Sequence, residues 1–119
     1  MQMIYKILTP PAWAQLRADG TLVPTGVDAA DGYVHFSTVA QLGETLDKHY
    51  AGHGDLVLLA LPSAALGDNL MWERARNGDL FPHLYAPLRA DMVRAHFCLN
   101  GARVGLKQWL AHQEAEAAA

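Results

Sequence analysis

DLVLLAL, residues 55–61, is a near-continuous apolar run that begins with an aspartate and is followed by Pro62. A short run without alternation of apolar and polar residues is typical of a strand that is buried on both faces. An amphipathic surface strand would instead place a polar side chain at every second position. We therefore predict a central strand at this position.

Outward from this run, the chain alternates between predicted strands and predicted helices. The strands are short runs rich in β-branched, aromatic or aliphatic residues: residues 3–8, 33–36, 70–73 and 92–99. The helices have capping or terminating residues at one or both ends: residues 9–20, a segment that begins at residue 37 or 38 and ends at residue 52 or 54, and residues 106–118. Residues 62–69 are predicted as a loop with room for one helical turn.

Proline and glycine decide the prediction for two further segments. Residues 21–32 contain Pro24, Gly26 and an Asp-Gly pair, which indicates turns around at most one short extended piece. Residues 81–88 contain Pro82 and Pro87. Because proline lacks the N–H donor that a central strand needs, we predict an ordered loop or an edge segment there.

Composition limits the class of protein. The chain has 119 residues, a net charge of −3 and 51% hydrophobic residues, which is typical of one folded domain. The charge argues against broad nucleic-acid binding and against attraction to anionic membranes. Cys98 is the single cysteine, so neither a disulfide framework nor a cysteine zinc site is expected. With no signal peptide and no apolar run long enough for a spanning helix, we expect a cytoplasmic protein without a membrane partner.

DGYVHFS, residues 31–37, is the first candidate for a functional site. If Val34 faces the core, strand alternation places Tyr33, His35 and Ser37 on the opposite face. The helix that follows would add free N–H groups, which suit an anionic or phosphate-bearing ligand. The alternative is structural: His35 packs beside Tyr33, and Ser37 only caps the helix.

Two further residues are weaker candidates. Glu73 follows Trp72, and a carboxylate beside an indole can be partly desolvated, although pairing with Arg74 or Arg76 on the surface is the simpler alternative. His83 lies in the proline-rich segment 81–88, either as part of a binding wall or as a plug of the core.

Metal binding is not expected. His49 and His53 are four residues apart, which is the spacing of a zinc-ligand pair on a helix. The neighbouring glycines indicate that the helix is already ending there, and no further ligand motif accompanies the pair.

The order of these segments resembles the family known as domain of unknown function 952 (DUF952). The resemblance is carried by IYKI at residues 4–7, DGYVHFS at residues 31–37, and GDLFPHLY at residues 78–85. It covers about residues 2–97. We therefore expect a domain over residues 1–97 and a C-terminal extension over residues 98–119, helical and frayed at its end.

The family is similar to the ADP-ribosyltransferase-like superfamily, and this likeness implies both a fold and a ligand. The implied fold is α+β, with two small, mainly antiparallel sheets, flanking helices and a cleft that holds NAD. The implied catalytic residues are His35, Glu73 and His83, of which His35 contacts the ribose. The implied cofactor-binding residues are Lys6, Tyr33, Ser37, Phe81 and Tyr85. Lys6 departs from the superfamily pattern, which has Arg or His at that position.

The resulting functional expectation is a small nucleotide-like ligand, with NAD as the cofactor and no metal. The chain is then an ADP-ribosyl- or phospho-transferase-like enzyme. The alternative is a non-catalytic module that binds a nucleotide-like ligand or a protein partner.

Overall fold

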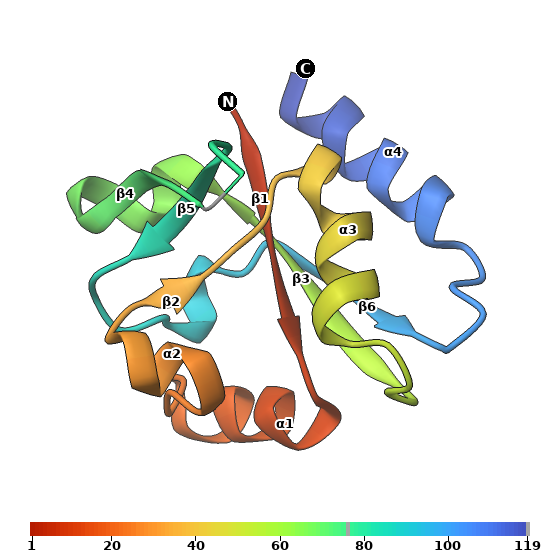
Figure 1. The fold of residues 1–119 in the computed structure, drawn as a ribbon, viewed down its shortest axis with the longest axis horizontal. Helices are drawn as coiled ribbons and strands as arrows, with labels where there is room; N and C mark the ends of the chain where they lie inside the picture. The colour runs from red at the N-terminus through yellow and green to blue at the C-terminus, as the bar shows by residue number, and fades with distance from the viewer. Residues whose placement is uncertain (76, 119) are drawn as a thin grey trace.

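The central sheet contains three antiparallel strands, β1 (Met3–Leu8), β3 (Leu56–Pro62) and β6 (Ala95–Leu99), in the order β1-β3-β6. The computed structural model describes residues 1–75 and 77–118. The strands of this sheet run through the middle of the molecule (Figure 1). β3 pairs with β1 on one side and with β6 on the other. The prediction of a central strand is therefore confirmed.

A second antiparallel sheet contains β2 (Val34–His35), β5 (Leu80–Leu84) and β4 (Leu70–Arg74), in the order β2-β5-β4. The helices are α1 (Pro10–Asp19), α2 (Gly26–Asp31), α3 (Val39–His49) and α4 (Leu106–Ala118), with 3-10 segments at η1 (Ser63–Asn69) and η2 (Ala90–Met92). The expected α+β architecture of two small antiparallel sheets with helices is confirmed.

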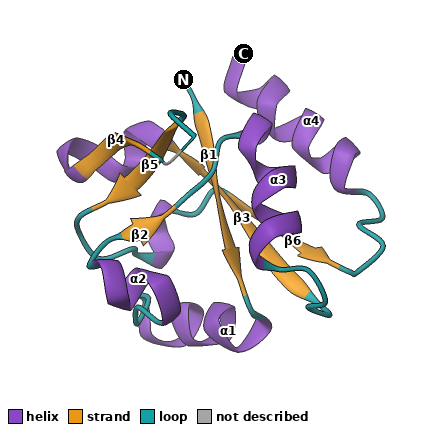
Figure 2. Cartoon of the chain, viewed as in Figure 1, coloured by secondary structure: helices purple, strands orange, loops and turns teal. Residues whose placement is uncertain are grey.

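The two faces of the central sheet are covered differently. Alternation along β1 sends Tyr5 and Ile7 to the face covered by α3 and α4, and Ile4 and Leu8 to the face covered by α1 and the second sheet. Figure 2 shows α3 and α4 on one side of the sheet and the second sheet on the other. Lys6 lies between Ile4 and Leu8 in this alternation, so its side chain extends into the layer between the two sheets.

The prediction that residues 81–88 form a loop or an edge segment is wrong for residues 81–84, which belong to β5, the middle strand of the second sheet, whereas residues 85–88 lie outside the strands. Pro82 fits there because β2 is very short. The Pro82 carbonyl accepts a hydrogen bond from the Phe36 N–H at 3.1 Å. Since the N and C=O of one strand residue point to the same side, the missing donor faces the end of β2 rather than β4.

The prediction of turns over residues 21–32 is also wrong in part, because α2 occupies residues 26–31. Thr25 precedes this helix in an extended conformation, and Gly32 ends it at φ 82°, with its N–H donated to the Asp28 carbonyl. A left-handed residue at this point is favourable for glycine and costly for residues with a Cβ. The pair Asp31-Gly32 therefore marks a helix end rather than a hairpin turn.

The start of α3 is confirmed in detail. The Thr38 hydroxyl accepts a hydrogen bond from the Gln41 N–H at 3.3 Å, and the Gln41 side chain accepts one from the Thr38 N–H at 3.0 Å. This reciprocal capping box satisfies two main-chain donors at the end of the helix.

Helix α4 lies within residues 98–119 and packs on the central sheet. The Trp109 ring stacks on Phe97 at 5.3 Å between centroids, and Ala117 is buried. The Tyr5 hydroxyl donates a hydrogen bond to Glu114 at 2.5 Å. This segment therefore covers apolar surface of the sheet. Within residues 1–75 and 77–118, no helix has the length and apolarity needed to cross a membrane.

Candidate functional site

The candidate site lies on the face of the second sheet that points away from the core. His35 of β2 and His83 of β5 are direct partners in the strand register, and their rings are 5.2 Å apart between centroids. The Tyr33 ring lies 4.5 Å from His35 and 4.2 Å from His83. Val34 and Leu84 point the other way and are buried. Strand alternation thus gathers three rings on one face.

His35 lies between two carboxylates of α2. Its Nδ1 is 2.6 Å from Asp28 Oδ1, and its Nε2 is 2.9 Å from Asp31 Oδ2. The other oxygen of Asp28 accepts a hydrogen bond from Lys6 Nζ at 2.6 Å. The side chains of Lys6 and Asp28 are only 7% and 8% exposed, whereas that of Asp31 is 46% exposed.

Burial and pairing act together on the charges beneath His35. Burial alone would raise the pKa of Asp28, but the His35 hydrogen bond and the Lys6 ammonium outweigh it, so the pKa lies below its ordinary value. Burial lowers the pKa of Lys6, and the charge of Asp28 offsets this only in part. Asp28 is therefore an ionised acceptor at neutral pH.

His83 has its own carboxylate partner. Its Nδ1 is 2.8 Å from Glu73 Oε1, and the Tyr85 hydroxyl donates to the same oxygen at 2.7 Å. These bonds from Tyr85 and His83 hold the pKa of Glu73 below its usual value. The alternative prediction was that Glu73 lies on the surface and pairs with Arg74 or Arg76. Arg74 does not pair with Glu73, because its guanidinium donates a hydrogen bond to the Gly78 carbonyl. Arg76 lies outside the described residues.

Replacing Glu73 with glutamine should lower the pKa of Tyr85. Hydrogen bonding to the Glu73 carboxylate is the main cause that raises this pKa to about 12. Without the carboxylate, the pKa should return toward its ordinary value of 10.0, as measured by phenolate absorbance in an alkaline titration. Since the folded-state pKa is raised, this bond contributes stability below about pH 10 that is lost as the pH rises through about 12.

A matched control for this titration is Glu44→Gln, because Glu44 pairs with Lys48 on the surface of α3. The control should titrate like the unmodified protein. An unchanged tyrosine titration in Glu73→Gln would contradict the hydrogen bond.

The structure brings together five of the eight residues expected at the site: His35, His83, Glu73, Tyr33 and Tyr85. Lys6 is buried, with 6% of its surface exposed, and is connected to this group only through its hydrogen bond to Asp28. Phe81 shares the face of His83 by alternation and is half-buried, opposite Glu73 in the β4–β5 register.

Ser37 lies apart from this group. The chain leaves the second sheet after His35, and Ser37 pairs with Tyr5 of β1 through two main-chain hydrogen bonds of 2.8 and 2.9 Å. Its hydroxyl contacts the Thr45 hydroxyl of α3 at 3.2 Å. The alternation expected over residues 33–37 therefore ends before Ser37.

Two residues of the site, Asp28 and Asp31, were absent from the predicted set. Their spacing of three places both carboxylates on one face of a helix, but only if residues 26–31 are recognised as helical. The signal that identifies this helix is Gly32, a C-terminal glycine directly after Asp31.

A groove of about 400 Å³ borders the site. Asp28, Tyr33 and Tyr85 belong to both the groove and the site, and much of the remaining wall is apolar. The other lining residues are Thr21, Leu22, Pro24, Ala29, Gly32, Val34, Leu84, Ala86, Pro87 and Leu88. This volume falls within the range of small-molecule sites.

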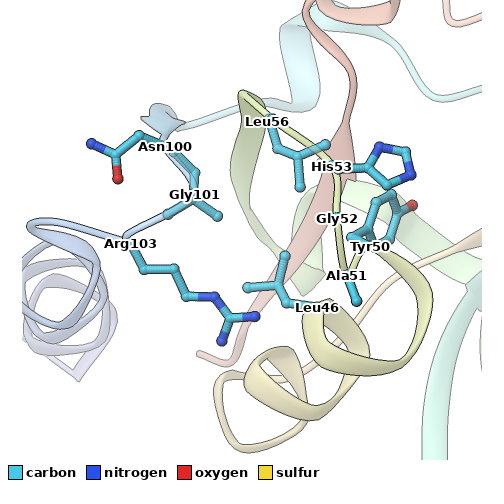
Figure 3. A pocket seen from close by; sticks show the side chains of 11 residues that line it. Leu46, Tyr50, Ala51, Gly52, His53, Leu56, Asn100, Gly101 and Arg103 are labelled. Carbon is cyan, nitrogen blue, oxygen red and sulfur yellow. The ribbon is translucent and has the colours of Figure 1, made fainter.

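A smaller pocket of about 100 Å³ lies where the end of α3 meets the start of β3 and the loop after β6 (Figure 3). Tyr50, His53 and Arg103 contribute to its lining, and none of the residues expected at the site does. α3 ends at His49, so His53 lies outside the helix. Among residues 1–75 and 77–118, no group of three or more His, Cys, Asp or Glu side chains is arranged to hold a metal ion.

One family model and the solved structures of one protein are similar to this chain. The family model described as "Protein of unknown function (DUF952)" matches residues 7–96. The crystal structure of protein CC0527 from Caulobacter crescentus is similar, with 40% identity, a TM-score of 0.83, and coverage of 92% of this chain and 98% of that chain. The solution NMR structure of CC0527 has 38% identity, a TM-score of 0.76, and coverage of 90% and 97%. A comparison with curated proteins gives no match.

Proposed function

Because the chain belongs to the DUF952 family, whose description assigns no function, we propose a function from the site itself: the face around His35 and His83 binds a nucleotide-like ligand, with NAD as the first candidate. One observation carries the proposal. Two histidines, each with a carboxylate partner, face one another across adjacent strands beside a groove of about 400 Å³.

The lining of the groove favours the proposal of a ligand with a planar ring. Tyr33 and Tyr85 lie 5.0 Å apart between centroids, and both contribute to the groove wall. Aromatic side chains stack on nucleobases and on the nicotinamide ring. Pro24 and Pro87 add exposed apolar surface to the wall, which favours the face of a ring over a bare phosphate.

The charges of the site support transfer chemistry at the ribose. Cleavage of the bond between nicotinamide and ribose passes through an oxocarbenium-like state, in which positive charge develops on the sugar. An ionised carboxylate nearby stabilises that charge. Glu73 meets this requirement, since hydrogen bonds from Tyr85 and His83 keep its pKa below the usual value. The proposed activity is an ADP-ribosyl- or phospho-transferase-like reaction. We propose that it takes place on an ADP-ribosyltransferase-like fold and in the cytoplasm.

Ligand binding is tested first, by calorimetry and thermal shift with NAD and with ADP-ribose. The unmodified protein should bind at least one of them, and His35→Ala should weaken this binding about tenfold, the range of one lost hydrogen bond to a ligand. His112→Ala is the matched control, because His112 pairs with Glu116 on the surface of α4. The absence of a shift at millimolar ligand would overturn the proposal.

Release of nicotinamide from NAD then separates an enzyme from a binding module. An enzyme releases nicotinamide alone or with an added acceptor. A clean preparation that binds ADP-ribose but releases none would favour the non-catalytic alternative.

A further inference from the structure

The Asp28 carboxylate of α2 accepts hydrogen bonds from residues of two strands, β1 and β2. Oδ2 accepts a hydrogen bond from Lys6 Nζ of β1 at 2.6 Å. Oδ1 accepts one from the His35 main-chain N–H at 3.1 Å and lies 2.6 Å from His35 Nδ1. Asp28 itself belongs to α2. One buried side chain thus connects the central sheet, a helix and the histidine strand.

Stability alone is a poor reason for a buried ion pair at this position. Removing two charges from water offsets much of their attraction, so an apolar pair of similar size is often equally stable. Elsewhere in the same layer, apolar side chains such as Leu16 of α1 make the contacts. An apolar pair, however, offers no acceptor to an imidazole ring.

The contact places a proton on Nδ1 of the His35 ring. An ionised carboxylate only accepts hydrogen bonds, so Nδ1 must donate to Asp28. Lys6 keeps the carboxylate ionised. Nε2 lies on the exposed side of the ring, within hydrogen-bond distance of Asp31 Oδ2 at 2.9 Å, so a ligand that binds Nε2 competes with the partly exposed Asp31. Carboxylates behind metal-bound histidines select the tautomer in the same way.

We propose that Lys6 and Asp28 are positioning residues, which hold His35 with its proton on Nδ1 and its Nε2 toward the ligand. Lys6 acts through Asp28 and does not contact the ligand. This role replaces the contact with the cofactor that the superfamily likeness implied for Lys6. This inference depends on the proposed function only for the identity of the ligand, and the position of the proton on His35 does not depend on it.

The unmodified protein supplies the first test. Long-range ¹H–¹⁵N NMR spectra distinguish the two neutral tautomers of each histidine ring, and the His35→Gln variant identifies the His35 signals. The expected result is a His35 ring protonated at Nδ1. A His35 ring protonated at Nε2, with a bare Nδ1, would overturn the proposal without any change to Asp28.

The second test removes the acceptor while keeping the fold. Lys6→Met combined with Asp28→Leu replaces both charges by apolar side chains, so no uncompensated charge stays buried. We expect His35 to lose its preference for the Nδ1 proton, and ADP-ribose to bind up to about tenfold more weakly, no more than the loss of the His35 contact itself would cause. Lys48→Met combined with Asp47→Leu is the matched control on α3, where Lys48 pairs with Glu44 and Asp47 with Arg103.

These readouts separate the positioning role from the proposed function. If ADP-ribose and NAD do not bind the unmodified protein, the proposed function fails, and the tautomer of His35 still decides the role of Asp28. If the ligand binds but the double variant leaves both tautomer and affinity unchanged, the positioning role is refuted and the pair only links α2 to β1.

Discussion

Replacing Asp28 with alanine is expected to lower the free energy of unfolding by about 3–5 kcal/mol, a large part of the roughly 5–15 kcal/mol that a domain possesses. The substitution leaves the Lys6 ammonium buried without its partner and removes the acceptor of the His35 main-chain N–H. An uncompensated buried charge is among the most costly single defects in a folded protein.

Urea denaturation followed by tryptophan fluorescence measures this loss. The double variant Lys6→Met, Asp28→Leu should recover most of it, since it buries no charge. Asp47→Ala, which removes a surface pair with Arg103, should cost at most about 1 kcal/mol. A loss below about 1 kcal/mol for Asp28→Ala would contradict a buried, compensating ion pair.

Acid should remove the same contribution from the unmodified protein. The folded-state pKa of Asp28 lies below the ordinary value of 3.8. The folded state therefore binds this proton less readily than the unfolded chain, so the contribution is present above pH 3.8 and is lost as the pH falls through the folded-state value. Thermal denaturation of the double variant should depend less on pH in this range.

Replacing His83 with glutamine is expected to slow nicotinamide release from NAD by about 10²- to 10⁴-fold, the usual contribution of a group that transfers a proton. This prediction follows from the proposed function. Glu73 holds Nδ1 of His83, and among residues 1–75 and 77–118 Nε2 has no hydrogen-bond partner. The His83 side chain is only 11% exposed, and Nε2 is its ring nitrogen that a hydroxyl of the acceptor or of the ligand would bind. Glutamine retains a hydrogen bond but transfers no proton at neutral pH.

Affinity and rate should respond differently in this variant. ADP-ribose binding should change by less than about tenfold, because only a hydrogen bond is altered. His112→Gln on α4 is the matched control and should leave both quantities unchanged. Equal rates for His83→Gln and the unmodified protein would show that His83 does not take part in proton transfer.

Local patterns in the sequence were sufficient to predict most elements and the orientation of Tyr33 and His35, whereas the place of His83 beside them was implied only by the superfamily likeness. The run at residues 55–61 forms the middle of the central sheet, and α3 begins directly after its cap at Thr38, in agreement with the predicted start. The alternation at Tyr33 and His35 placed both rings on the exposed face, because strand geometry is set within a few residues.

The predictions that failed depended on contacts between distant segments. Pro82 indicated a loop or an edge, but its missing donor falls beyond the end of β2, a fact that only the pairing of β2 with β5 reveals. Lys6 was expected to contact the cofactor, but it is buried against Asp28, which is 22 residues away. Asp28 in turn lies on a helix of six residues whose signal is mainly the glycine that ends it.

The short segment from Val34 to Ser37 has a consequence for motion. Val34 and His35 pair with β5, and the Phe36 N–H donates to the Pro82 carbonyl of that strand. The next residue, Ser37, bonds to Tyr5 of β1 in the central sheet. Moving the second sheet outward as a unit would break the two bonds between Ser37 and Tyr5, so these two amide protons should exchange with solvent only in an opening that also disrupts the edge of the central sheet. A ligand therefore enters a groove that already exists, and its arrival rate should not be limited by a hinge.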